Sequence, residues 1–402
     1  MSRPVSALLV LILGLLQAAG AGAQDNQDAE VKVDFVYFGR VEEPRVPLSL
    51  LDPVIENPGF PGARLGLEEN STTGGFLNHA YTLERVQVDP EADIVDAFTE
   101  RVEAGVSYFL VDLEKDDLLE VADSPSARNA VLLNVRARDD ELRNDNCRAN
   151  VLHIVPSRSM LADGLSQYLV WKRWNRWFLV VGRTPRDKLF AEAIRRSAKK
   201  FGARIVEEKE WKFDAGARRT DTGHVTAQQE VPAFTQGADH DVMIVADEAD
   251  LWGEYLSYRT FRPRPVAGTQ GLIPTAWHRS HEQWGGTQLQ RRFERLAGRD
   301  MTPRDYAAWA AVRAVGEAVT RLNSADPDEV RDALLSEDFK LAAFKGVPLN
   351  FRNWNGQLRQ PILLAAPRML VSVSPQKEFL HQYSQLDTLG WDRPESSCGA
   401  FE

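Results

Sequence analysis

The sequence predicts an α/β protein built as two lobes, each a mostly parallel sheet flanked by helices. The clearest observation is the stretch 176–211, which has the pattern strand, turn, helix, strand. Its apolar run 178–181 is typical of a strand buried on both faces, and such a βαβ unit requires a parallel sheet. Similar units occur on both sides of it. A chain of 402 residues also exceeds one comfortable core, so two lobes are expected.

Local signals mark the bounds of this unit. Thr184 and Pro185 give a cap-type residue followed by proline at the first helical position. Apolar residues then recur at helical spacing as far as Phe201, and Gly202 ends the helix. The second strand is expected to start at 203–206.

The first residues have the pattern of a secretory leader. Arg3 supplies a short positive region, 7–16 is apolar, and Ala21-Gly22-Ala23 is a small-residue cleavage site. We expect residues 1–23 to be a signal peptide cut after Ala23, the alternative being an uncleaved anchor. No later apolar run is long enough to cross a membrane. The mature chain is therefore predicted to be exported to the periplasm.

Charge and cysteine content narrow the function further. The net charge of −10 argues against nucleic acid as a partner. In an oxidising compartment, the even number of cysteines suggests a disulfide between Cys147 and Cys398. It would close a very long loop and stabilise the protein by on the order of 4 kcal/mol in the chain-entropy model. Two cysteines alone are not expected to hold a metal.

In the first half of the chain, apolar runs alternate with helical spacing. Four such strand–helix repeats make one complete lobe. A polar, Pro-rich segment follows the first strand, and the charged loop 136–150 contains Cys147. Strands are expected at 31–39, 81–88, 108–113 and 130–135, and helices at 62–79, 94–102 and 116–122.

The second half starts with a helix at 157–174 and continues through the βαβ unit. Prolines mark 262–269 as an edge strand. The tail after Pro375 is polar and expected to be extended. Between these, we expect a polar stretch at 214–223, helices near 225–234 and at 251–258, a strand at 241–246, an exit from the second lobe at 271–277, a helical region at 284–322 broken at 298–303, a helix at 326–335, and strands at 360–364 and 369–373.

The order of these elements over 31–373, behind a leader, resembles a type I periplasmic solute-binding protein of an ABC transporter, nearest to the branched-chain amino acid binding group. A narrower resemblance is to the substrate-binding family associated with PQQ-dependent alcohol dehydrogenase systems. It is carried by KKFG at 199–202, RRTD at 218–221, PVAGTQGLIPTAWH at 265–278, AGRDMTPRDYAAWAAVRA at 297–314, FRNWNGQLRQPILL at 351–364 and LDTLGWDRPESSC at 386–398.

The resemblance implies two lobes that close on a ligand about a hinge. It implies an extracytoplasmic component that delivers a small polar solute to an ABC permease in the inner membrane, linked to periplasmic alcohol oxidation, without catalysis or a cofactor. The alternative is a ligand-sensing or accessory binding protein of a quinoprotein dehydrogenase system. The predicted segments are lobe 1 at 31–154 plus about 271–362, lobe 2 at 155–270 plus about 363–380, the tail at 381–402, and hinge crossings at 154–157, 269–273 and 361–366.

A third class, a periplasmic enzyme, has little support. The sequence contains no G-x-S-x-G motif, no Walker loop and no Rossmann glycine fingerprint. Its histidines show no metal-ligand spacing beyond the weak pair His278 and His281, so no metal is expected. Trp171, Trp174 and Trp177 either line a cleft for an aromatic or quinone-like ligand or pack in the core.

Candidate binding residues follow one strand of the first lobe. Ligands in open α/β sheets bind outside the carboxyl ends of strands. Asp112 and Glu114, with Asp116 and Asp117, stand there in place of the small Ser/Thr/Gly-rich loop of amino-acid-binding relatives. Such carboxylates either hold a cation or hydroxyl donor, or cap a helix and face water. We therefore do not expect an ordinary zwitterionic amino acid as the ligand.

The corresponding place in the second lobe carries arginines. Arg183 and Arg186 flank the helix start at Thr184, a setting that suits an anionic group, with surface salt bridges as the alternative. We expect Asp112 or Glu114 to face Arg183 across the cleft. The full candidate set is Asp112, Glu114, Arg183, Thr184, Asp247 and Trp277.

Overall fold

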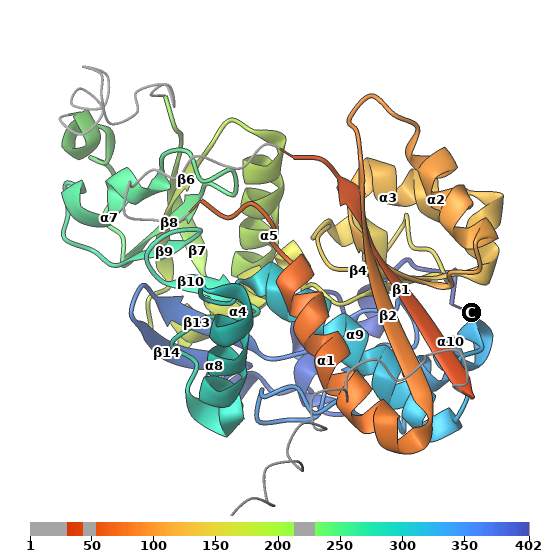
Figure 1. Cartoon of the computed structure of the whole chain (residues 1–402). Coiled ribbons are helices and arrows are strands. Elements are labelled where there is room, and N and C mark those ends of the chain that lie inside the picture. The colour runs from red at the N-terminus through yellow and green to blue at the C-terminus, as the bar shows by residue number, and fades with distance from the viewer. Residues whose placement is uncertain (1–29, 43–53, 213–229, 402) are drawn as a thin grey trace, which may run out of the picture.

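The computed structural model describes residues 30–42, 54–212 and 230–401. Two parallel sheets flanked by helices lie side by side in the view of Figure 1, which confirms the predicted fold class. Within the described ranges, no helix has the length and apolar character needed to span a bilayer. The predicted leader at 1–23, the polar stretch at 214–223 and the first half of the helix near 225–234 lie outside the described residues.

Lobe 1 is built on a five-stranded parallel sheet with the order β2-β1-β3-β4-β5. Its strands β3 and β4 are buried along their whole length and apolar up to their last residues, Asp112 and Asn134, which agrees with the predicted apolar runs. The sequence did not predict β5, because three residues are too few to show a period. The strands are β1 (Val31–Arg40), β2 (His79–Val88), β3 (Tyr108–Asp112), β4 (Val131–Asn134) and β5 (Val151–His153).

Helices cover both faces of this sheet. One face is covered by α2 (Ile94–Glu103) and α3 (Lys115–Asp123), which bury Phe98 and Leu118 against it. The other is covered by α1 (Phe60–Leu77), α8 (Gly286–Ala297), α9 (Pro303–Leu322) and α10 (Pro327–Leu335). Helices α1 and α9 approach closely at Gly62, where an added Cβ would lie 1.9 Å from Asp305 O. This contact joins the first and the last third of the chain.

Lobe 2 is built on a four-stranded parallel sheet with the order β7-β6-β8-β9. Its strands are β6 (Arg176–Val181), β7 (Arg204–Glu210), β8 (Val242–Ala246) and the predicted edge strand β9 (Val266–Gly268). One core holds buried residues of α4 (Arg158–Trp171) and α5 (Pro185–Phe201). A second core contains Phe234 and Leu256, the latter from the short helix α7 (Leu256–Arg259).

Segments near the end of the chain contribute residues to the cores of both lobes. Strands β10 (Ile273–Thr275), β13 (Ile362–Ala366) and β14 (Met369–Ser374) form an antiparallel sheet that contacts α4, and Ile362 belongs to the core of lobe 2. The hairpin of β11 (Asn350–Phe351) and β12 (Leu358–Arg359) instead adds Phe351 and Leu358 to the core of lobe 1.

The C-terminal tail is not extended, contrary to the prediction. It forms the 3-10 turns Lys377–Phe379, Gln385–Thr388 and Arg393–Glu395. Leu389 is fully buried, and the polar composition of the tail gave no indication of this burial. The predicted disulfide between Cys147 and Cys398 is confirmed, with the two Cα atoms 5.7 Å apart.

Candidate functional site

A polar pocket of about 120 Å³ lies where strand ends from the two lobes meet. Glu114 follows β3 and Val155 follows β5, whereas Arg186 lies at the start of α5 and Glu248 follows β8. This is the place where open α/β folds bind ligands. The lining residues are Glu114, Val135, Arg136, Ala137, Arg138, Asp139, Val155, Arg158, Arg186, Glu248 and Arg304.

Glu114 connects the lobes at one side of the pocket. Its carboxylate accepts a hydrogen bond from Arg136 Nε of lobe 1 at 2.6 Å and another from Arg186 of lobe 2. Arg136 also donates to Glu42. Burial alone would lower the pKa of Arg136, but the hydrogen bond to Glu42 and the charges of Glu114 and Asp112 raise it above its ordinary value. Arg136 is therefore a permanent cation in the pocket wall.

Arg158 makes a second connection between the lobes. It lies at the start of α4, which Ser157 caps. Arg158 Nε donates to Glu248 Oε2 of lobe 2 at 2.6 Å, and its Nη1 lies 3.0 Å from Asp139 Oδ1 of lobe 1. Burial would lower the pKa of Arg158, but Glu248 and Asp139 raise it. Arg138 Nη1 reaches the same Glu248 from lobe 1, at 3.9 Å.

Charged side chains line the pocket, and further carboxylates lie next to the lining residues. Five guanidinium groups and three carboxylates line it, so the wall carries an excess of two positive charges. Two more carboxylates, Asp112 and Glu42, lie behind the wall, within 4 Å of Arg304. No aromatic side chain is among the lining residues. The pocket surface is therefore polar, and each of its guanidinium groups is paired with a carboxylate.

The predicted acidic cluster does not converge on one point. Asp112 is buried behind the pocket, where its carboxylate accepts a hydrogen bond from Tyr37 at 2.8 Å. Glu114 lines the pocket. Asp117 turns away to pair with Arg40 at 2.8 Å, and the Asp116 side chain is 93% exposed. Among the three carboxylates at 114, 116 and 117, only Glu114 is in position to contact a solute.

The arginine of lobe 2 that reaches Glu114 is Arg186, three residues beyond the expected Arg183. The Arg183 side chain is 57% exposed and donates to Lys212 O at 3.1 Å. Thr184 forms a capping box with Asp187, accepting from the Asp187 N–H at 3.3 Å while Asp187 accepts from the Thr184 N–H at 3.1 Å. Thr184 therefore orients α5, and Arg186 with it.

Asp247 and Trp277 are both buried away from the pocket. The Asp247 carboxylate accepts the successive backbone N–H groups of 251–253 at 2.6–3.0 Å. Trp277 stacks on Tyr306 with ring centroids 4.9 Å apart, inside the core of lobe 1. Of the three spaced tryptophans, Trp177 is fully buried, Trp171 is 45% exposed and none lines the pocket.

Several lining residues were missed by sequence reasoning. Arg136, Arg138 and Asp139 directly follow the predicted strand at 130–135, so the strand-end argument that selected Glu114 applied to them too. The same holds for Glu248 after β8. Arg304 gave no local signal, because it reaches the pocket from α9.

Buried hydrogen bonds lie in and beside the predicted hinge crossings, and strand pairing joins Ile273 of the second crossing to Ala365 of the third. Gln360 donates to Ile154 O at 2.7 Å. Lys345 donates to the carbonyl oxygens of Ala276 and, at 3.3 Å, Pro361. Burial lowers the pKa of Lys345 to about 7. These bonds fix Ile154 of the first crossing and Pro361 of the third to residues beside the crossings, and the role of the crossings as a hinge stays a prediction.

Neither a protein-family model nor a curated protein matches this chain. Solved structures do match. A branched-chain amino acid ABC transporter periplasmic ligand-binding protein from Burkholderia xenovorans LB400 has a TM-score of 0.68 at 14% identity, covering 92% of this chain and 100% of that one.

Two further solved structures are similar over most of their length. The leucine-, isoleucine-, valine-, threonine- and alanine-binding protein of Brucella ovis, in a closed conformation, has a TM-score of 0.62 at 13% identity and covers 86% of this chain and 95% of its own. An R. palustris ABC transporter solute-binding protein in complex with benzoate has a TM-score of 0.60 at 11% identity, with coverages of 92% and 99%. At such identities the likeness shows the type I periplasmic binding protein fold.

Proposed function

We propose that this chain is the extracytoplasmic solute-binding component of an ABC transporter, holding its solute in the pocket between the lobes. The observation that carries the proposal is the composition of that pocket: residues of both lobes line it at the ends of their strands. A solute bound there contacts both lobes at once, so binding favours the closed arrangement over an open one. The protein acts in the periplasm after removal of its leader, performs no catalysis and delivers the solute to an inner-membrane permease.

The pocket favours a small hydrophilic anion. Five of its eight charged lining groups are guanidinium groups, Asp112 and Glu42 beside Arg304 balance the excess of two positive charges, and no aromatic ring lines it. Its volume of about 120 Å³ holds only a few heavy atoms. Guanidinium groups bind carboxylates with two parallel hydrogen bonds. A leucine side chain would have only Val135, Ala137 and Val155 as apolar neighbours. A short organic acid therefore fits better than a branched-chain amino acid.

The narrower sequence resemblance gives this solute a chemical context. Oxidation of an alcohol in the periplasm yields first an aldehyde and then a carboxylate. A short-chain carboxylate is therefore a product of the quinoprotein dehydrogenase systems with which the similar sequences are associated. In this proposal the protein collects such a product, or a close relative of it, for uptake.

Calorimetry with defined probes tests the proposal. The purified mature protein should bind short carboxylates such as glycolate or oxalate and should not bind leucine. Arg186→Met removes a charge-assisted hydrogen bond at the pocket and should weaken binding roughly ten- to a hundredfold. Arg183→Met is the matched control, because Arg183 lies on the same turn but outside the pocket. Tight binding of leucine, or equal effects of the two variants, would refute the assignment.

The sensing or accessory alternative makes a different prediction. A transport component contacts its permease, whereas an accessory protein contacts the dehydrogenase. Crosslinking in intact cells distinguishes the two, with recovery of a permease expected. Recovery of a dehydrogenase without a permease would favour the alternative.

A further inference from the structure

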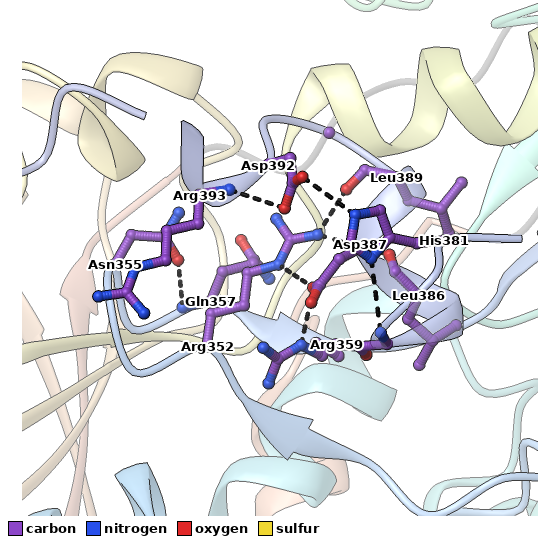
Figure 2. A network of polar contacts seen from close by, with 12 residues as sticks. Arg352, Asn355, Gln357, Arg359, His381, Leu386, Asp387, Leu389, Asp392 and Arg393 are labelled. Atoms are coloured by element: carbon purple, nitrogen blue, oxygen red, sulfur yellow. Dashed lines mark hydrogen bonds and ion pairs between the residues drawn. The ribbon is translucent and has the colours of Figure 1, made fainter. Parts of the chain in front are cut away.

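The tail segment 387–390 lies between the two lobes. On its lobe 1 side, Arg352 Nε and Arg359 Nε donate to Asp387 Oδ1 at 2.9 and 2.7 Å. Figure 2 shows these two guanidinium groups converging on the Asp387 carboxylate from the hairpin β11–β12. The neighbours of the two arginines on this hairpin, Phe351 and Leu358, belong to the core of lobe 1.

Arg352 also holds the backbone of the segment. Its Nη2 donates to Leu389 O at 2.7 Å, and its Nη1 donates to Trp391 O at 3.0 Å. Arg352 is 1% exposed and Asp387 is 4% exposed. Charge-assisted hydrogen bonds removed from water in this way are costly to leave unpaired.

On its other side, the segment is bound by helices of lobe 2. Asp163 of α4 is fully buried and accepts the Gly390 N–H at 2.9 Å. Lys200 of α5 donates to Thr388 O at 3.0 Å and to Asp163 at 3.0 Å. Leu389 is buried in the core of lobe 2. One short segment is therefore anchored by ionic side chains from both lobes.

Beyond the segment, the chain is fixed to lobe 1 beside a crossing. Ser396 Oγ donates to Arg143 O at 3.3 Å, and Cys398 is bonded to Cys147. Arg143 in turn donates to Val155 O at 3.0 Å, in the first predicted crossing. The disulfide therefore retains the tail near the place about which the lobes would rotate.

We propose that the segment 387–390 is an interlobe clamp that sets the resting angle between the lobes. Rotation of one lobe against the other separates the segment from either Arg352 and Arg359 or Asp163 and Lys200. Either loss leaves buried charged groups exposed or without a partner. The angle between the lobes that the structure shows is therefore favoured before any solute binds. The clamp is independent of the proposed solute, because none of its residues lines the pocket.

Single-molecule fluorescence transfer tests the clamp without a ligand. Non-canonical amino acids for labelling replace Glu91 of lobe 1 and Lys188 of lobe 2, both exposed. Asp387→Asn should broaden the distribution of transfer efficiency and shift its mean. Hydrogen exchange at the Gly390 amide, which donates to Asp163, should become roughly tenfold faster or more, because weakening the bonds of Asp387 to Arg352 and Arg359 lets the segment open more often.

Asp392→Asn is the matched control. Asp392 lies in the same tail, but the partners of its carboxylate are His381 and the Arg393 N–H, both within the tail (Figure 2). If Asp387→Asn and Asp392→Asn both leave the distribution unchanged, the clamp is refuted. Should Asp387→Asn fail to fold, Arg359→Met and Lys200→Met each remove one anchor from one lobe. Unchanged distributions in both of these variants would equally overturn the proposal.

Discussion

Lys345 offers a pH test of the packing between the crossings. Its side chain is 2% exposed, and its ammonium group lies 4.9 Å from the centroid of the Tyr306 ring. In the described part of the chain it forms no salt bridge with a carboxylate, and two carbonyl oxygens accept its hydrogen bonds. Burial therefore lowers its pKa from 10.5 to about 7. Replacing it with methionine removes the titrating group but keeps a chain of similar length.

The magnitude and sign follow from proton linkage. The unfolded chain holds the Lys345 proton up to about pH 10.4, whereas the folded protein releases it above about pH 7. The wild-type free energy of unfolding therefore gains a contribution as pH rises from about 7 to 10, by up to about 1.4 kcal/mol per pH unit. The full shift corresponds to on the order of 5 kcal/mol. Below pH 7 both states are protonated and this dependence ceases.

Urea unfolding at several pH values between 6.5 and 9.5 measures the effect. The stability of Lys345→Met relative to wild type should fall as pH rises through this window. Burial also lowers the pKa of His281, with a smaller contribution from the charge of Lys345, so the comparison relies on the alkaline part of this range. Lys340→Met, at an exposed position nearby in sequence, should show no such trend. A stability difference independent of pH, or a Lys345 pKa above about 9 by nuclear magnetic resonance, would refute the reasoning.

Two further predictions concern the disulfide and the packing of α1 against α9. Replacing Cys147 and Cys398 with serine should lower the free energy of unfolding by on the order of 5 kcal/mol, because the bond closes a loop of 251 residues. An unchanged urea midpoint would contradict this. Gly62→Ala should destabilise by about 1–3 kcal/mol through its clash with Asp305 O. An alanine side chain at Gly75, in the same helix, meets no atom within 4 Å, so Gly75→Ala should instead stabilise the protein by about 0.5–1 kcal/mol. Thermal melts measure both variants. If Gly62→Ala melts at a higher temperature than Gly75→Ala, the α1–α9 contact is loose.

Local signals predicted most of the fold because they are strong in this chain. The buried strands β3, β6 and β8 are continuous apolar runs, and α5 and α9 each begin with a threonine cap followed by proline. The misses occur where the signal is short or masked by polarity. Strand β5 has three residues, and the polar tail conceals Leu389.

The site was predicted by position but not by side chain. The argument from strand ends located Glu114 and the start of α5, both of which lie at the pocket. Which arginine points inward depends on the path of the turn before α5, because Arg183 precedes the Thr184 cap and Arg186 lies in the first turn of the helix, and the sequence does not specify which of them faces Glu114. Local sequence could not predict Arg304 as a lining residue, because the packing of α9 on α1 brings it to the pocket from far along the chain.

The disulfide also has a consequence for the order of events during synthesis. Cys147 and Cys398 are 251 residues apart, and the whole sheet of lobe 2 lies between them. At about 5–20 residues per second, Cys147 emerges roughly 10–50 s before its partner. Throughout that interval it has no other cysteine of the mature chain to pair with.

Both sheets can therefore assemble while the tail is still being made. The oxidation that fixes 387–390 between the lobes comes last, and it secures an arrangement that already exists. A truncated or interrupted chain never acquires the bond. The single covalent link thus distinguishes a finished molecule from an incomplete one, and its presence reports that the chain has been made at least as far as residue 398.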